Sequence, residues 1–459
     1  MRFRILAVVA VIAMVAAGCG SRLSDKEAAQ VNGGGGPAAT TATSGGGTAT
    51  TAAGETTTAA AATKGACGPG SATGATAPGV TNTSITIGTI QDITGARPGL
   101  MLGPQQAVQA FVDYCNSVGG VNGRKLVLQK YDSALFDDQK AATQACSGGN
   151  FAVVGQASAI DNTGAQTLVD CNLVSVPGFT ATAEFGGSQL MVQPLPNPPG
   201  SYAVGGAKYL AKRFPAAVKK ATVLYAGIDT TRFQVKRQVA AFEAAGWKYV
   251  YNAEYNPVNP DFSPNVVQIK GAGGQVWNLQ GEVTDFARVL SLFQQQGMNL
   301  PIRYGGQQDY TQELIDRAGA AAEGVIIEDT TVPFEEASSS PELQLYLKWL
   351  KNVDASAQPT ALAVQAWSAS LLFATALKSL GSNVTQNGLL DALHKIKVWN
   401  GNGIHATADP GDNIPTTCFA YLVVKDAKFQ RYYPKKGFSC DPQNVVTLKG
   451  DFGQGAARK

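Results

Sequence analysis

Two periodicities of apolar residues alternate along the chain from about residue 83 onward. Alternation at every second position, or a short apolar run, indicates a strand, whereas spacings of three and four indicate an amphipathic helix. The first four strands are expected at 84–88, 125–131, 151–155 and 174–176. The helix between the first two strands has its apolar stripe at Val108, Phe111, Val112 and Cys115. Single helices between consecutive strands indicate a parallel sheet with right-handed crossovers.

The same alternation restarts after residue 200. Further strands are expected at 221–225, 247–253, 275–279, 301–304 and 324–328. Helices are expected at 203–214 and 233–245 and, after Pro341, at 342–353, 361–380 and 388–396. The segment 418–433 alternates like a hairpin, with its turn at 426–428. Two successive arrays of this kind predict an α/β fold with two doubly wound parallel-sheet lobes.

The first eighteen residues have the pattern of a secretory signal. Arg2 and Arg4 precede a 13-residue apolar run, 5–17, which is shorter than the roughly 20 residues needed to cross a bilayer. The ending AAGC (16–19) resembles a bacterial lipobox, although Ala stands at 16 where Leu is usual. We therefore expect a lipoprotein signal peptide at 1–18 and lipidation of Cys19. A plain secreted protein is the alternative.

Residues 19–80 form the expected lipid-anchored linker. Gly, Thr and Ala dominate this segment, most strongly at 31–66. Because the segment has so few large apolar residues, it cannot bury enough surface to offset the conformational entropy lost on ordering. We therefore expect a disordered tether. No later stretch has the pattern of a membrane span, so lipid on Cys19 is the expected membrane contact, at the outer face of a bacterial cell membrane.

Charge and composition exclude several classes of function. The 459 residues include 36 Lys and Arg and 33 Asp and Glu, and loss of Arg2 and Arg4 leaves 34 basic against 33 acidic residues. This balance argues against a nucleic-acid partner, which selects a basic face. The two histidines, His394 and His405, argue against a zinc site. Neither a Walker A loop nor a GxSxG elbow occurs, so we expect no catalytic residue, metal or cofactor.

The cysteines predict a disulfide framework. Six remain when Cys19 is set aside, and an even number in an exported protein indicates three disulfides. The helices that end near Cys146 and Cys171 follow consecutive strands and should lie side by side. Cys418 and Cys440 flank the hairpin, while Cys67 precedes the first strand, near the end of the helix that carries Cys115. The expected pairs are therefore Cys67–Cys115, Cys146–Cys171 and Cys418–Cys440.

An ordered series of sequence segments carries a family resemblance. The segments are IGTIQDITG (87–95), GGVNGRKLVLQKYD (119–132), VVGQASA (153–159), VPGFTAT (176–182), DFSPNVVQIKGAGGQVWNLQGE (261–282), the helix with Trp367, and NGNGIHATADPGDN (400–413). Together they resemble the branched-chain amino-acid (leucine/isoleucine/valine) type of ABC-transporter substrate-binding protein, a type I periplasmic-binding fold. The resemblance covers about 83–433. It implies crossovers near 201, 332 and 405, with lobe 1 formed by 81–201 and 333–404 and lobe 2 by 202–332 and 405–459.

The carboxyl ends of the strands are where the ligand is expected. In open α/β sheets, ligands bind in the crevice beyond these ends. The loops that follow the predicted strands bring to this place Thr94, Ser158, Ala159, Phe179, Thr180, Glu282, Gln307, Gln308 and Asp309.

The resemblance implies roles for some of these residues. Ser158, Ala159 and Thr180 would contact the carboxylate and ammonium of an amino acid, and the aromatic ring of Phe233 would pack on the ligand. Phe233 lacks the hydroxyl of the usual Tyr, and Gln307 stands where the family has an acid. Because a buried ammonium needs a charged partner, an α-amino acid would require Asp309 or Glu282 instead. An amide, a carboxylic acid or another small polar molecule remains open.

These observations predict an extracytoplasmic solute-binding lipoprotein. The resemblance implies that it closes around a small polar ligand and delivers it to the permease and ATPase subunits of an ABC importer. We expect a monomer. The alternatives are a ligand-sensing or interaction lipoprotein with the same fold, and an enzyme on a two-domain α/β scaffold. The enzyme is disfavoured because the sequence has no visible nucleophile–base pair.

Overall fold

The computed structural model describes residues 65–458. The predicted signal peptide, Cys19 and most of the predicted linker lie outside the described residues. The main strands are β1 Ser84–Gln91, β2 Lys125–Asp132, β3 Ala152–Val154, β4 Ser175–Val176, β6 Ala221–Ala226, β7 Tyr249–Tyr255, β8 Val276–Gln280, β9 Ile302–Gly305, β10 Ile326–Asp329, β11 Cys418–Lys425 and β12 Lys428–Tyr433. The α-helices are α1 Leu102–Ser117, α2 Asp138–Ser147, α3 Asn162–Asp170, α4 Ala183–Gly186, α5 Gly205–Arg213, α6 Asp229–Ala244, α7 Ser263–Gly271, α8 Val283–Gln295, α9 Gln312–Ala318, α10 Pro341–Val353, α11 Ala361–Ser379 and α12 Gln386–His394.

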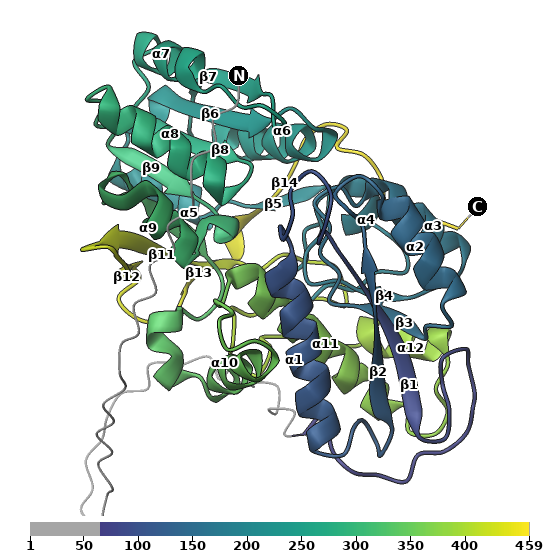
Figure 1. Ribbon diagram of the computed structural model, residues 1–459. Helices are drawn as coiled ribbons and strands as arrows, with labels where there is room; N and C mark the ends of the chain where they lie inside the picture. The colour runs from purple at the N-terminus through teal and green to yellow at the C-terminus, as the bar shows by residue number, and fades with distance from the viewer. Residues whose placement is uncertain (1–64, 459) are drawn as a thin grey trace, which may run out of the picture. The chain divides into compact units, whose positions relative to one another are not determined.

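The first lobe is built on a four-stranded parallel sheet in the order β2-β1-β3-β4. Helices α1 and α11 pack on one face, and α2 and α3 cover the other (Figure 1). The apolar stripe predicted for α1 lies in this core, because Val108, Phe111, Val112 and Cys115 are all buried. The helices come from distant parts of the chain, so the segment after residue 332 completes the first lobe.

Helix α11 is a core element of this lobe. It is long and apolar enough, by length and composition alone, to cross a membrane. No such helix was expected after the signal peptide. However, 83% of its apolar window is buried inside the protein. Its many alanines let it approach α1 and the sheet closely, and Trp367 on this helix packs edge-on against Phe111 of α1. Burial on all sides accounts for its composition.

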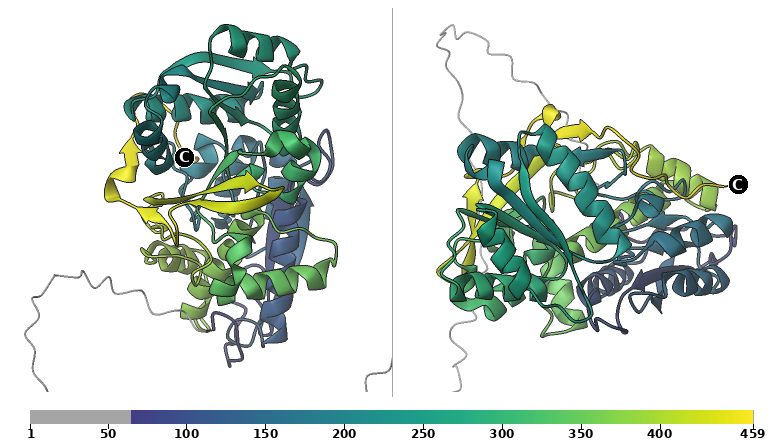
Figure 2. Two further views of the ribbon diagram at one scale, coloured as in Figure 1. Left: turned by 90° about the vertical axis from the view of Figure 1, so that its left-hand side faces the viewer. Right: turned by 90° about the horizontal axis from the view of Figure 1, so that it is seen from above.

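The second lobe is built on a larger sheet in the order β12-β11-β10-β9-β8-β6-β7. The strands β6 to β10 pair in parallel, whereas β11 and β12 are antiparallel. Helices α7, α8 and α9 pack on one face, and α5 and α6 on the other. The predicted hairpin is confirmed: Asp426 and Ala427 have positive φ angles of 53° and 55°, as a tight two-residue hairpin turn requires. The left view of Figure 2 shows the two strands of this hairpin in yellow, and β11 pairs with β10 of the second-lobe sheet.

All three predicted disulfides are present. Cys67 pairs with Cys115, Cys146 with Cys171 and Cys418 with Cys440. The second bridge joins the end of α2 to the end of α3, and the third joins β11 to the short strand β13 (Ser439–Cys440). The second bridge therefore connects helices whose adjacency follows from the alternation of strands and helices.

Two short strands at the connection between the lobes were not predicted. β5 (Ser201–Ala203) pairs antiparallel with β14 (Val445–Thr447), so the helix expected from residue 203 begins only at Gly205. Likewise, the strand expected from Trp247 begins at Tyr249. Strands of three residues have no measurable period, which is why the sequence does not reveal them.

Two segments assigned by the sequence to the second lobe contact the first. Asn413 donates a side-chain hydrogen bond to the carbonyl of Gly186, at the end of α4 (2.9 Å). The backbone amide of Ala456 donates to the carbonyl of Glu184 (2.8 Å), and that of Gln189 donates to the carbonyl of Ala456 (3.0 Å). We therefore propose that the third crossover lies near residue 415 and that the C-terminal tail returns to lobe 1.

Candidate ligand-binding site

A cavity of about 940 Å³ is lined by both lobes. Its walls are formed by the loops that follow the carboxyl ends of β1, β2, β3 and β4 in the first lobe and of β6, β8 and β9 in the second. The first turns of α6 and α11 complete the lining. The carboxyl ends of the strands, where the ligand was expected, therefore surround one cavity in both lobes.

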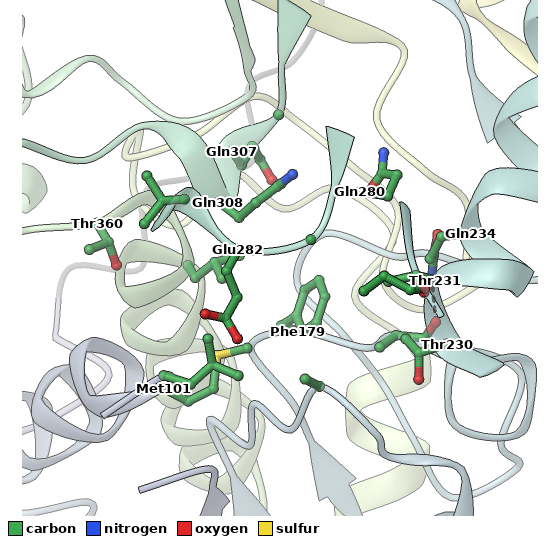
Figure 3. A pocket seen from close by; sticks show the side chains of 18 of the residues that line it. Met101, Phe179, Thr230, Thr231, Gln234, Gln280, Glu282, Gln307, Gln308 and Thr360 are labelled. Atoms are coloured by element: carbon green, nitrogen blue, oxygen red, sulfur yellow. Dashed lines mark hydrogen bonds between the residues drawn. The ribbon is translucent and has the colours of Figure 1, made fainter. Parts of the chain in front are cut away.

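Six of the ten ligand contacts predicted from the sequence line this cavity. They are Ala159, Phe179, Thr180, Glu282, Gln307 and Gln308. Figure 3 shows Phe179 and Glu282 in the middle of the cavity, below Gln307 and Gln308. Contact between these side chains and a ligand stays a prediction.

The loop after β4 forms one part of the wall from the first lobe. Phe179 presents an aromatic ring, which can pack on an apolar part of a ligand. Next to it, the buried Thr180 hydroxyl donates to Oε1 of Gln193 (2.9 Å). Gln193 in turn donates to the carbonyl of Gly178 (3.2 Å). Thr180 is therefore held in a fixed orientation at the edge of the cavity.

The wall from the second lobe begins at the first turns of α6. Thr230, Thr231 and Gln234 lie together on one side of the cavity (Figure 3). Gln234 also donates through Nε2 to the carbonyl of Ala181 (2.5 Å), a contact from the second lobe to the first. This hydrogen bond would break if the lobes moved apart, because its donor and acceptor lie on different lobes.

A network of neutral and acidic groups holds Gln307 at another part of the wall. Its amide nitrogen donates to Oγ1 of Thr330 (2.6 Å) and to Oδ1 of Asp329 (3.1 Å). Its amide oxygen accepts from Nε2 of Gln365 on α11 (2.6 Å). Burial raises the pKa of Asp329 above its usual range. Gln307 therefore offers a ligand little hydrogen-bonding capacity beyond these partners.

Arg97, which the sequence analysis did not single out, carries the main charge contact across the cavity. It lies in the loop after β1, and its guanidinium forms ion pairs with Glu282 (3.1 Å) and Asp285 (3.5 Å) of the second lobe. It also donates to the carbonyl of Pro257. Burial raises the pKa values of Glu282 and Asp285, an effect that the nearby Arg97 opposes. Glu282 is thus already paired with a cation from the protein.

Ser158 is buried below the cavity and does not line it. Its hydroxyl lies 3.5 Å from Oδ1 of Asp92, and the backbone amide of Ala159 donates to Oδ2 of Asp92 (2.7 Å). Asp92 itself is fully buried. Both residues were expected to contact a ligand, whereas in the structure their donors face a carboxylate of the chain.

Thr94, Phe233 and Asp309 also lie outside the lining. The Thr94 hydroxyl donates to Oδ2 of Asp132 (2.5 Å) and so braces the loop after β1. The ring of Phe233 is covered by the guanidinium of Arg237, 5.0 Å from its centroid. Asp309 is fully buried, accepts a hydrogen bond from the amide of Gly306 (3.0 Å), and has its pKa raised to about 8 by burial. Loop positions alone could not tell which side chains turn inward.

The sequence contained a weak signal for the residues that it missed. Thr230, Thr231 and Gln234 occupy positions that share one side of a helix start, close to the end of a predicted strand. Met101 and Thr360 precede helices in the same way and are found at the cavity wall (Figure 3). Among residues 65–458, no group of three or more His, Cys, Asp or Glu side chains is arranged to hold a metal ion.

A family model now connects this architecture with known proteins. The model described as "Periplasmic binding protein" matches residues 84–428, which include both sheets and the cavity. The chain belongs to the periplasmic binding protein family. A search of curated protein sequences found no match.

Solved structures of periplasmic binding proteins share its fold. A putative branched-chain amino acid ABC transporter protein from Rhodospirillum rubrum is 23% identical with a TM-score of 0.58, and the alignment covers 76% of this chain and 100% of that one. A leucine binding protein from Thermotoga maritima is 16% identical with a TM-score of 0.66, covering 78% and 99%. A solute binding protein from R. palustris, in complex with 4-hydroxybenzoate, is 16% identical with a TM-score of 0.65, covering 78% and 97%. The expected type I fold is confirmed.

Proposed function

We propose that this periplasmic binding protein captures a small polar ligand outside the cytoplasm and delivers it to the permease and ATPase subunits of an ABC importer. The observation that carries the proposal is the cavity of about 940 Å³ with walls from both lobes. The proteins with the same fold include a leucine binding protein and an ABC transporter solute binding protein solved in complex with 4-hydroxybenzoate. They support the proposed role in transport, while the ligand has to follow from this chain's own residues.

Capture follows from the position of the cavity between two lobes. A ligand that touches Phe179 and Thr180 of the first lobe and Thr231 of the second makes its full set of contacts only when the lobes are close. Binding then favours the closed arrangement by the free energy of the added contacts. The Arg97–Glu282 ion pair and the Gln234–Ala181 hydrogen bond would form in the same arrangement and add to it. A permease can distinguish the loaded protein by this change.

The proposal includes binding without conversion. The lining has amide, hydroxyl and aromatic groups. Its ionisable groups include Glu282 and Asp285, which pair with Arg97, and Glu313, which pairs with Arg317. A general base needs to reach a substrate proton, and a nucleophile needs a base to activate it. We therefore propose a binding protein and not an enzyme. A sensor that signals through the same closure would bind identically, and neighbouring genes for a permease and an ATPase would favour transport.

Native mass spectrometry tests this function. Protein purified without denaturation from the producing cells should carry one small molecule per chain, and denaturation should release that molecule with its mass unchanged. Re-addition at about a hundred times its dissociation constant should stabilise the fold by roughly 2.7 kcal/mol. The proposal fails if the bound molecule is converted on incubation. It also fails if no molecule is retained and none in a small-molecule extract of those cells raises the melting temperature.

A further inference from the structure

Asp92 accepts hydrogen bonds from several of the donors that the first lobe offers beyond its strand ends. Its carboxylate accepts from the backbone amides of Ala159 (2.7 Å) and Leu135 (3.0 Å) and from the hydroxyl of Ser133 (2.6 Å). The Ser158 hydroxyl approaches to 3.5 Å. The donors come from loops after two different strands, β2 and β3, and converge on one carboxylate.

This arrangement directs the donors away from the cavity. Leu135 and Ala159 line the cavity, but their amides point to Asp92, which is fully buried and does not belong to the lining. Backbone amides at strand ends are the groups that usually bind an anion in an open α/β sheet. Here they already hold one. A ligand carboxylate would have to displace Asp92 or remain without these donors, and an unpaired buried charge is strongly unfavourable.

The charged side chains of the lining are satisfied within the protein as well. Arg97 pairs with Glu282 and Asp285, and Arg317 pairs with Glu313 (2.6 Å). A carboxylate oxygen of Glu328 accepts from the hydroxyls of two tyrosines, Tyr304 (2.7 Å) and Tyr421 (3.2 Å). An anionic ligand would need one of these ion pairs to break, whereas a neutral ligand would not. Burial raises the pKa of Glu328, so its carboxyl group favours the neutral form more than an exposed one does.

Neutral polar groups make up much of the remaining lining. Gln280, Gln308 and Thr231 are among the neutral polar residues of the lining (Figure 3), and Phe179 supplies an aromatic surface. Gln307, where the sequence analysis looked for an acid, is a neutral amide held by Thr330 and Gln365. Amides and hydroxyls can donate and accept at once, which suits a ligand with amide, carbonyl or hydroxyl groups.

We propose that the ligand is an uncharged polar molecule without a carboxylate, because the buried side chain of Asp92 fills the anion-binding position of lobe 1. This inference rests on the proposed function, since it names the ligand class of the same cavity. It excludes zwitterionic amino acids and aromatic carboxylates as cognate ligands.

Formate is the direct probe of the Asp92 position. Asp92→Ala leaves the donors of Leu135, Ala159 and Ser133 without an acceptor, so the melting temperature of this variant should fall. Formate should then restore a large part of the loss in a saturable manner at pH 7, while leaving wild type unchanged. Asp92→Asn is the matched control, because its side chain fills the same space and should give no response to formate. The inference is overturned if formate stabilises wild type, or if folded Asp92→Ala does not respond to it.

A matched ligand panel tests the same inference on wild-type protein, independently of whether Asp92→Ala folds. The panel holds one carbon skeleton as 4-methylpentanamide, 4-methylpentanoate, 4-methylpentylamine and leucine, and a second as 4-hydroxybenzamide and 4-hydroxybenzoate. In calorimetry, no charged compound of the panel should bind more tightly than the amide with the same carbon skeleton. Tighter binding of any anion, cation or zwitterion would overturn the inference but leave the proposed function intact. Failure of the proposed function would instead appear as the absence of any retained small molecule, with the formate result unaffected.

Discussion

At the scale of single residues, the first lobe contains ionisable groups whose burial opposes their charge. Asp138 accepts a hydrogen bond from the amide of Gly164 (2.9 Å), but its Oδ1 has no hydrogen-bond partner among the described residues. Burial, and then repulsion by the nearby Asp161, raises the pKa of Asp138 to about 8. Burial raises the pKa of Asp161 to about 7, although Thr182 and Ala181 donate to it. Both carboxyl groups therefore favour the protonated form in the folded protein.

These shifts predict how stability depends on pH. A carboxyl whose folded pKa lies above its unfolded pKa binds more protons when folded, so its stabilising effect is complete below about pH 4 and is lost as pH rises to about 8. Burial lowers the pKa of His405 to about 4. Its contribution to the free energy of unfolding therefore rises with pH, but only below about pH 6.5, the pKa of an unfolded histidine. Between pH 6.5 and 8 we therefore expect the free energy of unfolding of wild type to fall.

Asp138→Asn should make this decrease smaller. The amide cannot ionise, so the contribution of Asp138 disappears, while Asp309, whose pKa is raised to about 8, continues to act in both proteins. Urea unfolding of wild type and variant at pH 6.5 and pH 8 measures the difference. An equal decrease in the two proteins would contradict the assignment to Asp138.

The direction in which loop side chains point was the property least predictable from the sequence. The first strand was expected to end at Gly88, whereas β1 continues to Gln91. Nothing in the motif at 87–95 shows that Asp92 accepts hydrogen bonds from residues up to 67 positions away. The direction of a loop side chain depends on contacts between strands, and a single sequence does not contain that register. Thr94 and Phe179 follow strands of the same sheet in the same way, yet of the two only Phe179 lines the cavity.

At the scale of elements, the sequence predicted the regular helices and strands well. The stripe of α1 and the hairpin of β11 and β12 have strong periods because each has one buried face. The disulfides followed from the ends of such elements. The pairing of β5 with β14 could not be predicted, because it joins two three-residue segments about 240 residues apart.

The N-terminal segment is the element with the clearest consequence for location. We propose that Cys19 carries the lipid that holds the protein at the membrane, as its AAGC context (16–19) indicates. Cys19→Ala should therefore release the protein from the membrane fraction, because the chain would lack its acyl anchor. Fractionation followed by immunoblotting measures the distribution, with Cys146→Ser as a control for loss of a cysteine elsewhere. Unchanged membrane association of Cys19→Ala would refute lipid anchoring.

At the scale of the whole binding protein, the connections between the lobes and the contacts across the cavity have different roles. We propose that the segments near β5, Thr331 and residue 415 are the covalent connections between the lobes. Arg97 contributes charge contacts across the cavity mouth, and its side chain is about one-quarter exposed (24%), so solvent weakens them. We therefore expect the ligand, rather than these ion pairs, to supply most of the free energy of closure.

The central claim is that a ligand held by both lobes draws them together, and small-angle X-ray scattering tests it most directly. Addition of the small molecule recovered by native mass spectrometry should lower the radius of gyration of wild type in a saturable manner. Phe179→Ala should need roughly tenfold more ligand, about 1.4 kcal/mol, since its ring lines the cavity. Phe233→Ala, which removes an aromatic ring outside the lining, should respond like wild type. A radius of gyration that does not change at saturating ligand would contradict the account.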